Sequence, residues 1–184
     1  MKVTALKLAG VKLLEPQVYQ DSRGWFYESY HYSRFLTEAG IHDTFLQDNH
    51  SRSAQNTLRG LHYQSRPGQA KLVRCTQGVI VDVAVDLRHG SSTYGKWLEV
   101  ALSGAMALYI PVGFAHGFYA TTDCEVEYKC SAHYNAETEC SIAWDDPDIG
   151  IRWPSPHPVL SERDQKAESF AAFRARDPLF YFSG

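Results

Sequence analysis

Polar and aromatic side chains that a protein core would not select gather in three parts of the sequence. Residues 21–28 read Asp-Ser-Arg-Gly-Trp-Phe-Tyr-Glu, so that an arginine and a glutamate lie on either side of aromatic rings. Residues 47–51 read Gln-Asp-Asn-His-Ser, residues 58–64 read Leu-Arg-Gly-Leu-His-Tyr-Gln, and Lys71 follows. Residues 110–118 read Ile-Pro-Val-Gly-Phe-Ala-His-Gly-Phe. Histidine, lysine, arginine and carboxylate groups carry out proton transfer, metal ligation and anion binding, so we look for chemistry in these three parts.

The histidines at positions 62 and 116 first raise the question of a metal site. The segment Pro-x-Gly-x-x-His that ends at His116 matches the second motif of the cupins, where this turn places a histidine at the mouth of a β-barrel. Metal-binding cupins carry His-x-His and a glutamate in their partner motif, whereas His62 is followed by tyrosine and glutamine. One histidine from each motif is fewer than the three or more protein ligands that a transition-metal site normally has. The sequence therefore predicts no metal site.

Strands must position these residues, because the middle of the chain alternates short apolar runs with turn signals. Residues 79–87 are rich in β-branched side chains, and Asp82 and Asp86 within them would point to the same face of a strand. Turns rich in glycine, serine and proline separate such runs near residues 89–92, 103–104 and 111–113. This spacing predicts an antiparallel sandwich or barrel. The other predicted strands cover residues 71–75, 98–102, 107–110, 117–121 and 126–132.

Helical signals are confined to two places. Residues 33–39 contain apolar side chains at helical spacing and stop at Gly40. Ser161 precedes residues 165–176 and is placed to cap a C-terminal helix there. The sequence thus predicts two short helices beside the strands.

The composition indicates one globular domain over residues 1–184, since the chain is 44% hydrophobic and 21% charged. Eighteen Lys and Arg against 21 Asp and Glu leave a net charge of -3, which excludes a general nucleic-acid binder. Residues 100–122 lack charged side chains but contain proline and glycine, so two buried strands are favoured over a membrane helix. The first residues do not form a signal-peptide pattern, and the four cysteines lack metal-binding spacing. We therefore expect a soluble, cytoplasmic protein with reduced thiols.

Motifs spread along the chain resemble those of the dTDP-4-dehydrorhamnose 3,5-epimerase family. The similarity covers roughly residues 15–165, and the motifs follow the order of the family. It implies an all-β, cupin-type double-stranded β-helix (a jelly roll) with a few short flanking helices. The motifs are Asp-x-Arg-Gly-x-Phe-x-Glu (21–28), Gln-Asp-Asn-His-Ser (47–51), Leu-Arg-Gly-Leu-His-Tyr-Gln (58–64), Lys-Leu-Val-Arg-Cys (71–75), Asp-Val-Ala-Val-Asp-Leu-Arg (82–88), Pro-x-Gly-Phe-Ala-His-Gly-Phe (111–118), Trp-x-Asp-Pro (144–147), Ile-x-Trp-Pro (151–154) and Leu-Ser-x-x-Asp (160–164).

The resemblance also implies an activity. Family members are isomerases that need no metal or organic cofactor and act on a dTDP-linked 4-keto-6-deoxyhexose in deoxysugar biosynthesis of the dTDP-rhamnose type. Carbons C3 and C5 flank the C4 ketone, so their protons are acidified because the resulting carbanion delocalises as an enolate. The resemblance further implies a homodimer, in which the segment before Arg23 packs against the partner subunit and contributes to its site.

Four residues match the catalytic positions of the family. His62 matches the base, and an imidazole has an unperturbed pKa of about 6.5, which suits proton abstraction near neutral pH. Asp164 matches the carboxylate that fixes the tautomer of this histidine and stabilises the imidazolium. Tyr128 matches the proton donor for the opposite face of the sugar. Lys71 matches the positive group beside the developing enolate oxygen.

Further residues match binding positions of the family. Arginine carries forked donors that suit a diphosphate, and the remaining side chains offer polar contacts or a ring face. Taken singly, any of them would more often be a solvated surface residue, and only their joint occurrence supports a binding role. The matched residues are Arg23, Phe26, Glu28, Gln47, Asp48, Asn49, Arg59, His116, Glu139 and Arg163.

Three departures from the family pattern point to a specialised member, for example one that epimerises C3 alone. The connection at residues 103–107 is compact, His133 stands where a second aromatic residue is frequent, and Arg163 stands where a lysine is common. Two alternative functions stay open at this point. A metal-dependent cupin oxygenase or isomerase is disfavoured by the missing His-x-His. A non-catalytic sugar-nucleotide-binding cupin has no need for His62, Tyr128 and Asp164 together.

Overall fold

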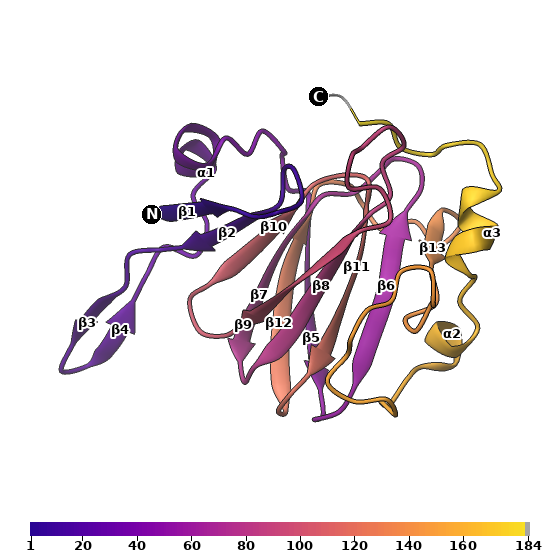
Figure 1. Cartoon of the computed structure of the whole chain (residues 1–184). Helices are drawn as coiled ribbons and strands as arrows, with labels where there is room; N and C mark the ends of the chain where they lie inside the picture. Colours follow the sequence, from indigo (N-terminus) through magenta and orange to yellow (C-terminus); the bar gives the residue numbers. More distant parts are fainter. Residues whose placement is uncertain (183–184) are drawn as a thin grey trace.

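The computed structural model describes residues 1–182, which fold mainly into strands arranged in two facing sheets (Figure 1). The larger sheet has the strand order β1-β2-β10-β7-β12-β5, and the smaller sheet has the order β13-β6-β11-β8-β9. Neighbouring strands pair antiparallel throughout both sheets. This is the jelly roll that the sequence predicts. The strand bounds are β1 Lys2–Ala5, β2 Lys12–Glu15, β3 Tyr19–Asp21, β4 Gly24–Phe26, β5 Gln47–Ser53, β6 Leu58–Gln64, β7 Lys71–Gln77, β8 Ile80–Asp86, β9 Trp97–Leu102, β10 Ala107–Ile110, β11 Phe114–Ala120, β12 Cys124–Cys130 and β13 Glu139–Ser141.

The main hydrophobic core lies between the two sheets. Val73 and Val126 of the larger sheet pack with Ile80 and Phe118 of the smaller sheet, and each of these side chains is buried. Inward and outward residues alternate along the strands because successive side chains point to opposite faces. Burial of this apolar surface is the main term that holds the sheets together.

Each predicted strand is found within three residues of its predicted bounds, and the largest difference is at the start of β11. The predicted strand at residues 117–121 is the second half of a longer strand, β11, which begins at Phe114, ends at Ala120 and is buried along its whole length. His116 therefore lies within a strand, two residues after it begins, while the turn before it ends at Gly113. The uncharged segment of residues 100–122 forms β10, β11 and the end of β9, as expected. Among the described residues, no helix is long and apolar enough to cross a membrane.

The predicted helix at residues 33–39 is confirmed as α1, Tyr32–Ala39. His31 caps its first turn, and Gly40 ends it with a left-handed backbone (φ 58°), a conformation that glycine adopts without steric cost. The predicted continuous C-terminal helix is wrong. Ser161 caps α2, Glu162–Gln165, but the chain then leaves the helix and restarts as α3, Phe170–Arg174, which Ser169 caps.

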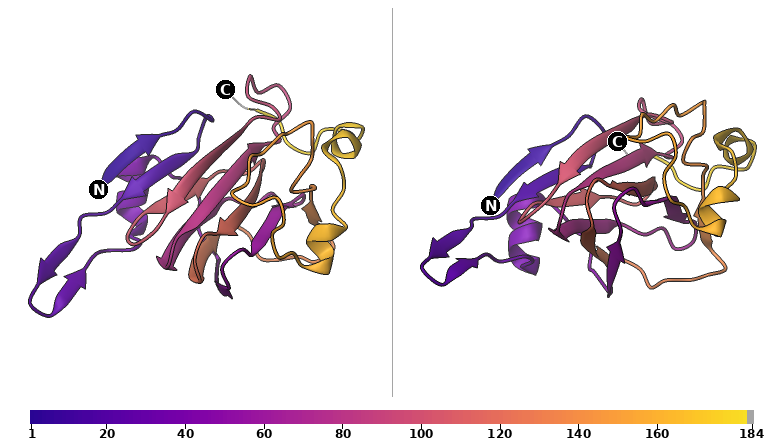
Figure 2. Two further views of the ribbon diagram at one scale, coloured as in Figure 1. Left: turned by 60° about the horizontal axis from the view of Figure 1, so that its bottom comes forward. Right: turned by 90° about the horizontal axis from the view of Figure 1, so that it is seen from below.

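A separate hairpin, β3–β4, extends from the barrel near the N-terminus (Figure 1). The views in Figure 2 show that it projects away from both sheets, at the end of the molecule opposite α2 and α3. Trp25 and Phe26 are 68% and 66% exposed there, which is unusual for large aromatic side chains. The hairpin therefore has apolar surface that the chain itself does not cover.

Candidate active site

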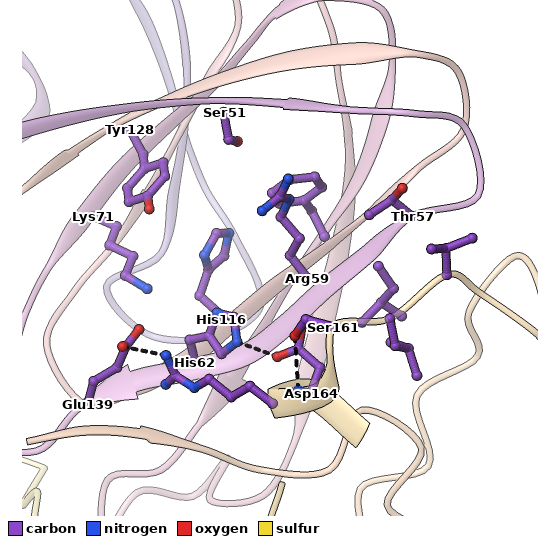
Figure 3. A pocket seen from close by; sticks show the side chains of 15 residues that line it. Ser51, Thr57, Arg59, His62, Lys71, His116, Tyr128, Glu139, Ser161 and Asp164 are labelled. Carbon is purple, nitrogen blue, oxygen red and sulfur yellow. Dashed lines mark hydrogen bonds and ion pairs between the residues drawn. The ribbon is translucent and has the colours of Figure 1, made fainter. Parts of the chain in front are cut away.

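A cavity of about 430 Å³ opens between the two sheets at the end of the barrel covered by α2 (Figure 3). Eight of the residues predicted from the sequence line it: His62, Lys71, Tyr128, Asp164, Arg59, His116, Glu139 and Arg163. These residues come from β6, β7, β11, β12, β13 and the α2 segment. The fold thus gathers side chains that are up to 105 positions apart in the sequence, from Arg59 to Asp164.

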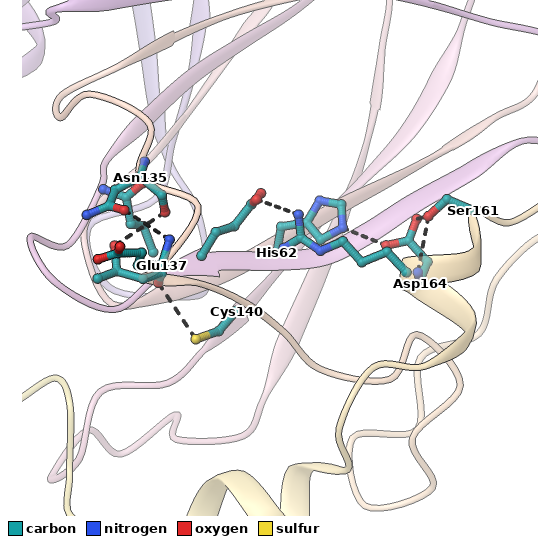
Figure 4. A network of polar contacts seen from close by, with 10 residues as sticks. His62, Asn135, Glu137, Cys140, Ser161 and Asp164 are labelled. Carbon is teal, nitrogen blue, oxygen red and sulfur yellow. Dashed lines mark hydrogen bonds and ion pairs between the residues drawn. The ribbon is translucent and has the colours of Figure 1, made fainter.

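His62 and Asp164 form a hydrogen-bonded pair at one wall of the cavity (Figure 4). Nε2 of His62 lies 2.6 Å from Oδ1 of Asp164, and the hydroxyl of Ser161 donates to Oδ2 at 2.9 Å. Ser161 also accepts a hydrogen bond from the Asp164 backbone N–H at 3.1 Å, so the cap of α2 holds the carboxylate in place. Burial raises the pKa of Asp164, but the hydrogen bonds and charge of His62 and the Ser161 hydroxyl outweigh it. The net pKa lies below its usual value, so Asp164 is ionised beside the imidazole.

Lys71 and Tyr128 lie on the opposite wall, which belongs to the larger sheet (Figure 3). They stand on neighbouring strands, because β7 pairs with β12 in a register that sets Lys71 opposite Cys130. Burial lowers the pKa of Lys71, partly against the attraction of Cys130, Glu139 and Asp82. Burial raises the pKa of the Tyr128 hydroxyl. The tyrosine therefore keeps its proton at neutral pH, and the ammonium gives up its proton more readily than an exposed lysine would.

Two guanidinium groups lie in the cavity, and each is held by its neighbours. Nε of Arg59 donates to Oγ of Ser53 at 2.9 Å, and Nη2 donates to the carbonyl of Arg52 at 3.1 Å. Arg163 forms an ion pair with Glu139. A fixed arginine binds an anion with less loss of side-chain freedom than a mobile one.

Two glycines allow the neighbouring strands β6 and β11 of the smaller sheet to approach closely near the two histidines. A Cβ atom on Gly117 would lie 2.8 Å from the carbonyl oxygen of Arg59, and one on Gly60 would lie 2.5 Å from Cα of Gly117. Neither position has room for a side chain. This close approach of β6 and β11 sets His62 and His116 opposite each other in the register.

His116 also pairs with a carboxylate, which the sequence did not predict for it. Both oxygens of Asp82 lie about 3 Å from Nε2 of His116, at 3.0 and 2.9 Å. Asp82 is fully buried in β8 and adjoins β11. Its place between apolar residues of the strand was the one signal in the sequence that could have identified it.

Six of the ten predicted binding residues do not line the cavity, and three of these six lie in or just after the β3–β4 hairpin. Arg23 and Phe26 belong to the β3–β4 hairpin, where the side chain of Arg23 is 88% exposed and contacts Asp21. Glu28 follows the hairpin and forms an ion pair with Arg34 of α1. In this chain the hairpin points away from the barrel, so these residues do not reach the cavity of their own subunit (Figure 1).

The other three predicted residues that do not line the cavity lie at the start of β5 and divide between its two faces. Gln47 donates to Asn49 at 2.9 Å, and Asn49 lies 3.5 Å from the sulfur of Cys130 on the inner side. Asp48 points outward and pairs with Lys129 at 2.9 Å. The alternation of a strand separates these side chains, although they are adjacent in the sequence.

Ser51 is a cavity residue that the sequence analysis did not single out. Its hydroxyl oxygen is buried and has no hydrogen-bond partner among residues 1–182. Buried polar atoms are almost always paired, so this oxygen fits a polar ligand in the cavity. Alternation from Asn49 would have placed it on the inner face. The other lining residues that were not predicted are Thr57, Leu58, Phe118, Val159, Leu160 and Ser161.

The histidines of the cavity form separate pairs with carboxylates and do not converge on one point as metal ligands do. Within residues 1–182, no group of three or more His, Cys, Asp or Glu side chains is arranged to hold a metal ion. His62 and His116 each have a carboxylate of their own, Asp164 and Asp82. A jelly roll with two carboxylate-paired histidines on one wall of the cavity and a lysine and a tyrosine on the other places the protein among the cupin-type folds.

Comparison with known proteins identifies the family. The sequence model for dTDP-4-dehydrorhamnose 3,5-epimerase matches residues 5–172. A dTDP-4-dehydrorhamnose 3,5-epimerase of Pseudomonas aeruginosa is 47% identical over 175 residues, which cover 93% of this chain and 97% of the relative. The chain belongs to the dTDP-4-dehydrorhamnose 3,5-epimerase family, a family of isomerases. The family predicted from the sequence is thus confirmed.

Solved structures agree with this membership. A dTDP-6-deoxy-D-glucose-3,5-epimerase of Legionella pneumophila, in complex with dTDP-4-keto-L-rhamnose, superimposes with a TM-score of 0.94 and is 42% identical. That comparison covers 100% of this chain and 99% of the other. ChmJ of Streptomyces bikiniensis, a 3'-monoepimerase in complex with dTDP-quinovose, gives a TM-score of 0.86 and 36% identity, covering 92% of this chain and 89% of the other. Relatives that share this fold thus include a monoepimerase.

Proposed function

We propose that this chain epimerises a dTDP-linked 4-keto-6-deoxyhexose at C3, at C5 or at both carbons, in the cytoplasm and without a cofactor. The observation that carries the proposal is one cavity with the His62–Asp164 pair on one wall and Lys71 and Tyr128 on the other. A base and an acid on opposite faces of a planar enolate are what inversion requires. The ligand of the Legionella relative supplies the substrate class.

The first step breaks the C–H bond next to the ketone. Nε2 of His62 is engaged by Asp164, so Nδ1 is the nitrogen that takes the proton. The electron pair of the C–H bond forms the C3–C4 double bond, and the carbonyl pair moves to O4. Asp164 stabilises the imidazolium that results. Lys71 donates a hydrogen bond to O4, where negative charge develops.

The second step returns a proton to the opposite face of the same carbon. Tyr128 holds its proton at neutral pH because burial raises its pKa. It donates that proton to C3 as the electron pair returns from O4, which restores the ketone with inverted configuration. The same pair of groups serves C5 after the sugar presents its other flank.

Asparagine in place of Asp164 is expected to lower kcat about 10²-fold or more with little change in KM. The amide can donate to Nε2 of His62 and thereby favour the tautomer whose Nδ1 carries a proton and cannot act as base. Steady-state kinetics measure both constants. Asp148→Asn is a matched control, because Asp148 is a surface carboxylate that pairs with Arg174. A rise in KM alone would contradict the role given to Asp164.

Solvent exchange tests the proposed function directly. In deuterium oxide with dTDP-4-keto-6-deoxyglucose, we expect deuterium to enter C3 at least, and proton NMR resolves C3 from C5. Exchange should persist in the presence of a metal chelator. Exchange at neither carbon would refute the epimerase proposal. If the chelator abolished exchange and the purified protein contained stoichiometric iron, manganese or zinc, a metal-dependent cupin would be favoured instead.

We also propose a homodimer in which the β3–β4 hairpin of each subunit completes the cavity of the other. The exposed rings of Trp25 and Phe26 support this, since apolar surface of this size is normally covered. Arg23 would bring a further positive charge to the diphosphate. Light scattering should give a mass about twice the chain mass of 20.8 kDa, and a monomer mass would refute the dimer.

Complementation between two impaired variants tests whether the hairpin acts on the partner subunit. Arg23→Ala is expected to weaken nucleotide binding and turnover by about 10-fold or more. If the hairpin acts in the partner, a mixed dimer of Arg23→Ala and His62→Ala chains has one intact site. About half of the dimers are then mixed, so about a quarter of the wild-type activity should return after subunit exchange. No recovery after demonstrated exchange would refute the action of the hairpin on the partner subunit.

A further inference from the structure

Asp82 is a fully buried carboxylate to which the mechanism above gives no role. It lies in the middle of β8, whose other residues are mainly valine, isoleucine and alanine. An ionised carboxylate in an apolar strand is costly unless a partner compensates for the lost water. The partner here is Nε2 of His116, which lies 3.0 Å from Oδ1 and 2.9 Å from Oδ2. The fold therefore holds a buried Asp82–His116 pair beside the cavity.

The geometry of this contact places a proton on Nε2 of His116. Both carboxylate oxygens of Asp82 are almost equally distant from the nitrogen, as they are when one N–H is shared between two acceptors. A protonated carboxyl group donating to Nε2 would bring its hydroxyl oxygen closer than the other oxygen. An ionised carboxylate only accepts hydrogen bonds, so Nε2 is the donor.

The second nitrogen of the imidazole, Nδ1, opens into the cavity. His116 lines the cavity, whereas Asp82, which pairs with Nε2, is fully buried and is not among the lining residues. Among residues 1–182, no group forms a hydrogen bond with Nδ1 of His116. The one side-chain oxygen or nitrogen of these residues that is both completely buried and without a hydrogen-bond partner is Oγ of Ser51, so Nδ1 is not completely buried. Because Nδ1 has no partner among these residues and keeps some accessible surface, and because His116 lines the cavity, we infer that Nδ1 faces the cavity.

The groups around His116 keep its ring uncharged. Burial lowers the pKa of His116, and the charge of Asp82 offsets this only in part. The charges of Lys71 and His62, which face the ring from β7 and β6, lower the pKa of His116 further. A neutral imidazole with a proton on Nε2 carries a lone pair on Nδ1.

We propose that Asp82 is a positioning residue that holds His116 in the neutral Nε2–H tautomer, so that Nδ1 accepts a hydrogen bond from a hydroxyl group of the hexose. This inference rests on the proposed function and narrows the binding role predicted for His116. Phosphate oxygens are acceptors and cannot pair with a lone pair, so the diphosphate belongs to donors such as Arg59. His116 therefore selects for the sugar and not for the nucleotide.

Nitrogen-15 NMR of the imidazole rings in the full-length protein without ligand tests the tautomer. We expect Nε2 of His116 to carry a proton and Nδ1 to be unprotonated from about pH 6 to about pH 8, with assignment by comparison with His116→Phe. In Asp82→Asn the amide can donate to Nε2, and a population protonated on Nδ1 should appear. A charged ring, or a proton on Nδ1 in the wild type, would overturn the proposal.

Binding of dTDP and dTDP-glucose, measured by calorimetry, tests the assignment to the sugar without any turnover. His116→Phe should bind dTDP like the wild type and bind dTDP-glucose about 10-fold more weakly, and Asp82→Asn should show the same pattern at about 5-fold. Asp86→Asn is the matched control, because Asp86 is a buried carboxylate of the same strand that pairs with Arg88, and its binding should not change.

Each remaining outcome decides one of the two proposals. Equal losses of dTDP and dTDP-glucose affinity in His116→Phe would assign His116 to the diphosphate and overturn the inference. Unchanged affinity for both ligands would overturn it as well. If the wild type bound neither nucleotide, the proposed function itself would fail, while the NMR experiment would still decide the tautomer.

Discussion

Alanine in place of His62 is expected to lower epimerisation by about 10³-fold or more and to abolish deuterium exchange at both carbons. Asp164 meets Nε2 of His62 at 2.6 Å, which leaves Nδ1 of His62 as the base in the proposed mechanism. Without the base, no enolate forms, so exchange and inversion fail together. Proton NMR in deuterium oxide measures exchange, and a coupled assay measures inversion.

Binding of dTDP shows whether the His62→Ala protein is intact. The nucleotide contacts proposed for Arg59 do not involve the imidazole, so the affinity for dTDP should stay within about 2-fold of the wild type. His42→Ala is the matched control, because His42 is exposed and lies outside the cavity. Appreciable exchange in His62→Ala would mean that another group removes the proton.

Phenylalanine in place of Tyr128 is expected to separate the two half-reactions. Inversion should fall by roughly 10²-fold, the usual effect of removing a positioned acid, while exchange at C3 persists. His62 still removes the proton in this variant and returns a solvent-derived deuteron to the same face. The ring of Tyr128 packs against the main core, and phenylalanine keeps that packing. The ratio of exchange to inversion, measured in one NMR time course, should therefore rise steeply.

The comparison with Tyr94→Phe isolates the effect of the hydroxyl. Tyr94 is half-buried against Phe170, on the outer side of the smaller sheet, and does not line the cavity. Its variant should match the wild type in both exchange and inversion. If Tyr128→Phe also matched the wild type, Tyr128 would be a packing residue and the acid would be another group.

Much of the fold follows from local sequence. The strands of the jelly roll, the short helix before Gly40 and the cap at Ser161 are set by side chains that are neighbours in the chain. The C-terminal helix was predicted as one segment because its break depends on distant partners. Glu168 bridges to Ile142, and Phe170 and Phe173 are buried against the smaller sheet, which overrides helical continuity between α2 and α3.

The sequence predicts which residues line the cavity better than it predicts which of them form hydrogen bonds with one another. Residue types and motif order identified eight side chains of the cavity, whereas the partner of each depends on strand register. Asp82 and His116 meet across 34 positions, and His62 and Asp164 across 102. The opposite faces of Asp48 and Asn49 and the departure of the hairpin from its own barrel follow from tertiary packing in the same way.

The acid and the base that we propose stand on different sheets of the sandwich, and this has a consequence for stereochemistry. His62 belongs to β6 of the smaller sheet and Tyr128 to β12 of the larger one, so no loop or hinge joins them. Their separation is set by the thickness of the apolar filling between the sheets, including Val73 and Phe118. In the proposed mechanism, the distance between acid and base therefore depends on core packing. Substitutions that change core volume would alter the fidelity of inversion without touching a polar atom.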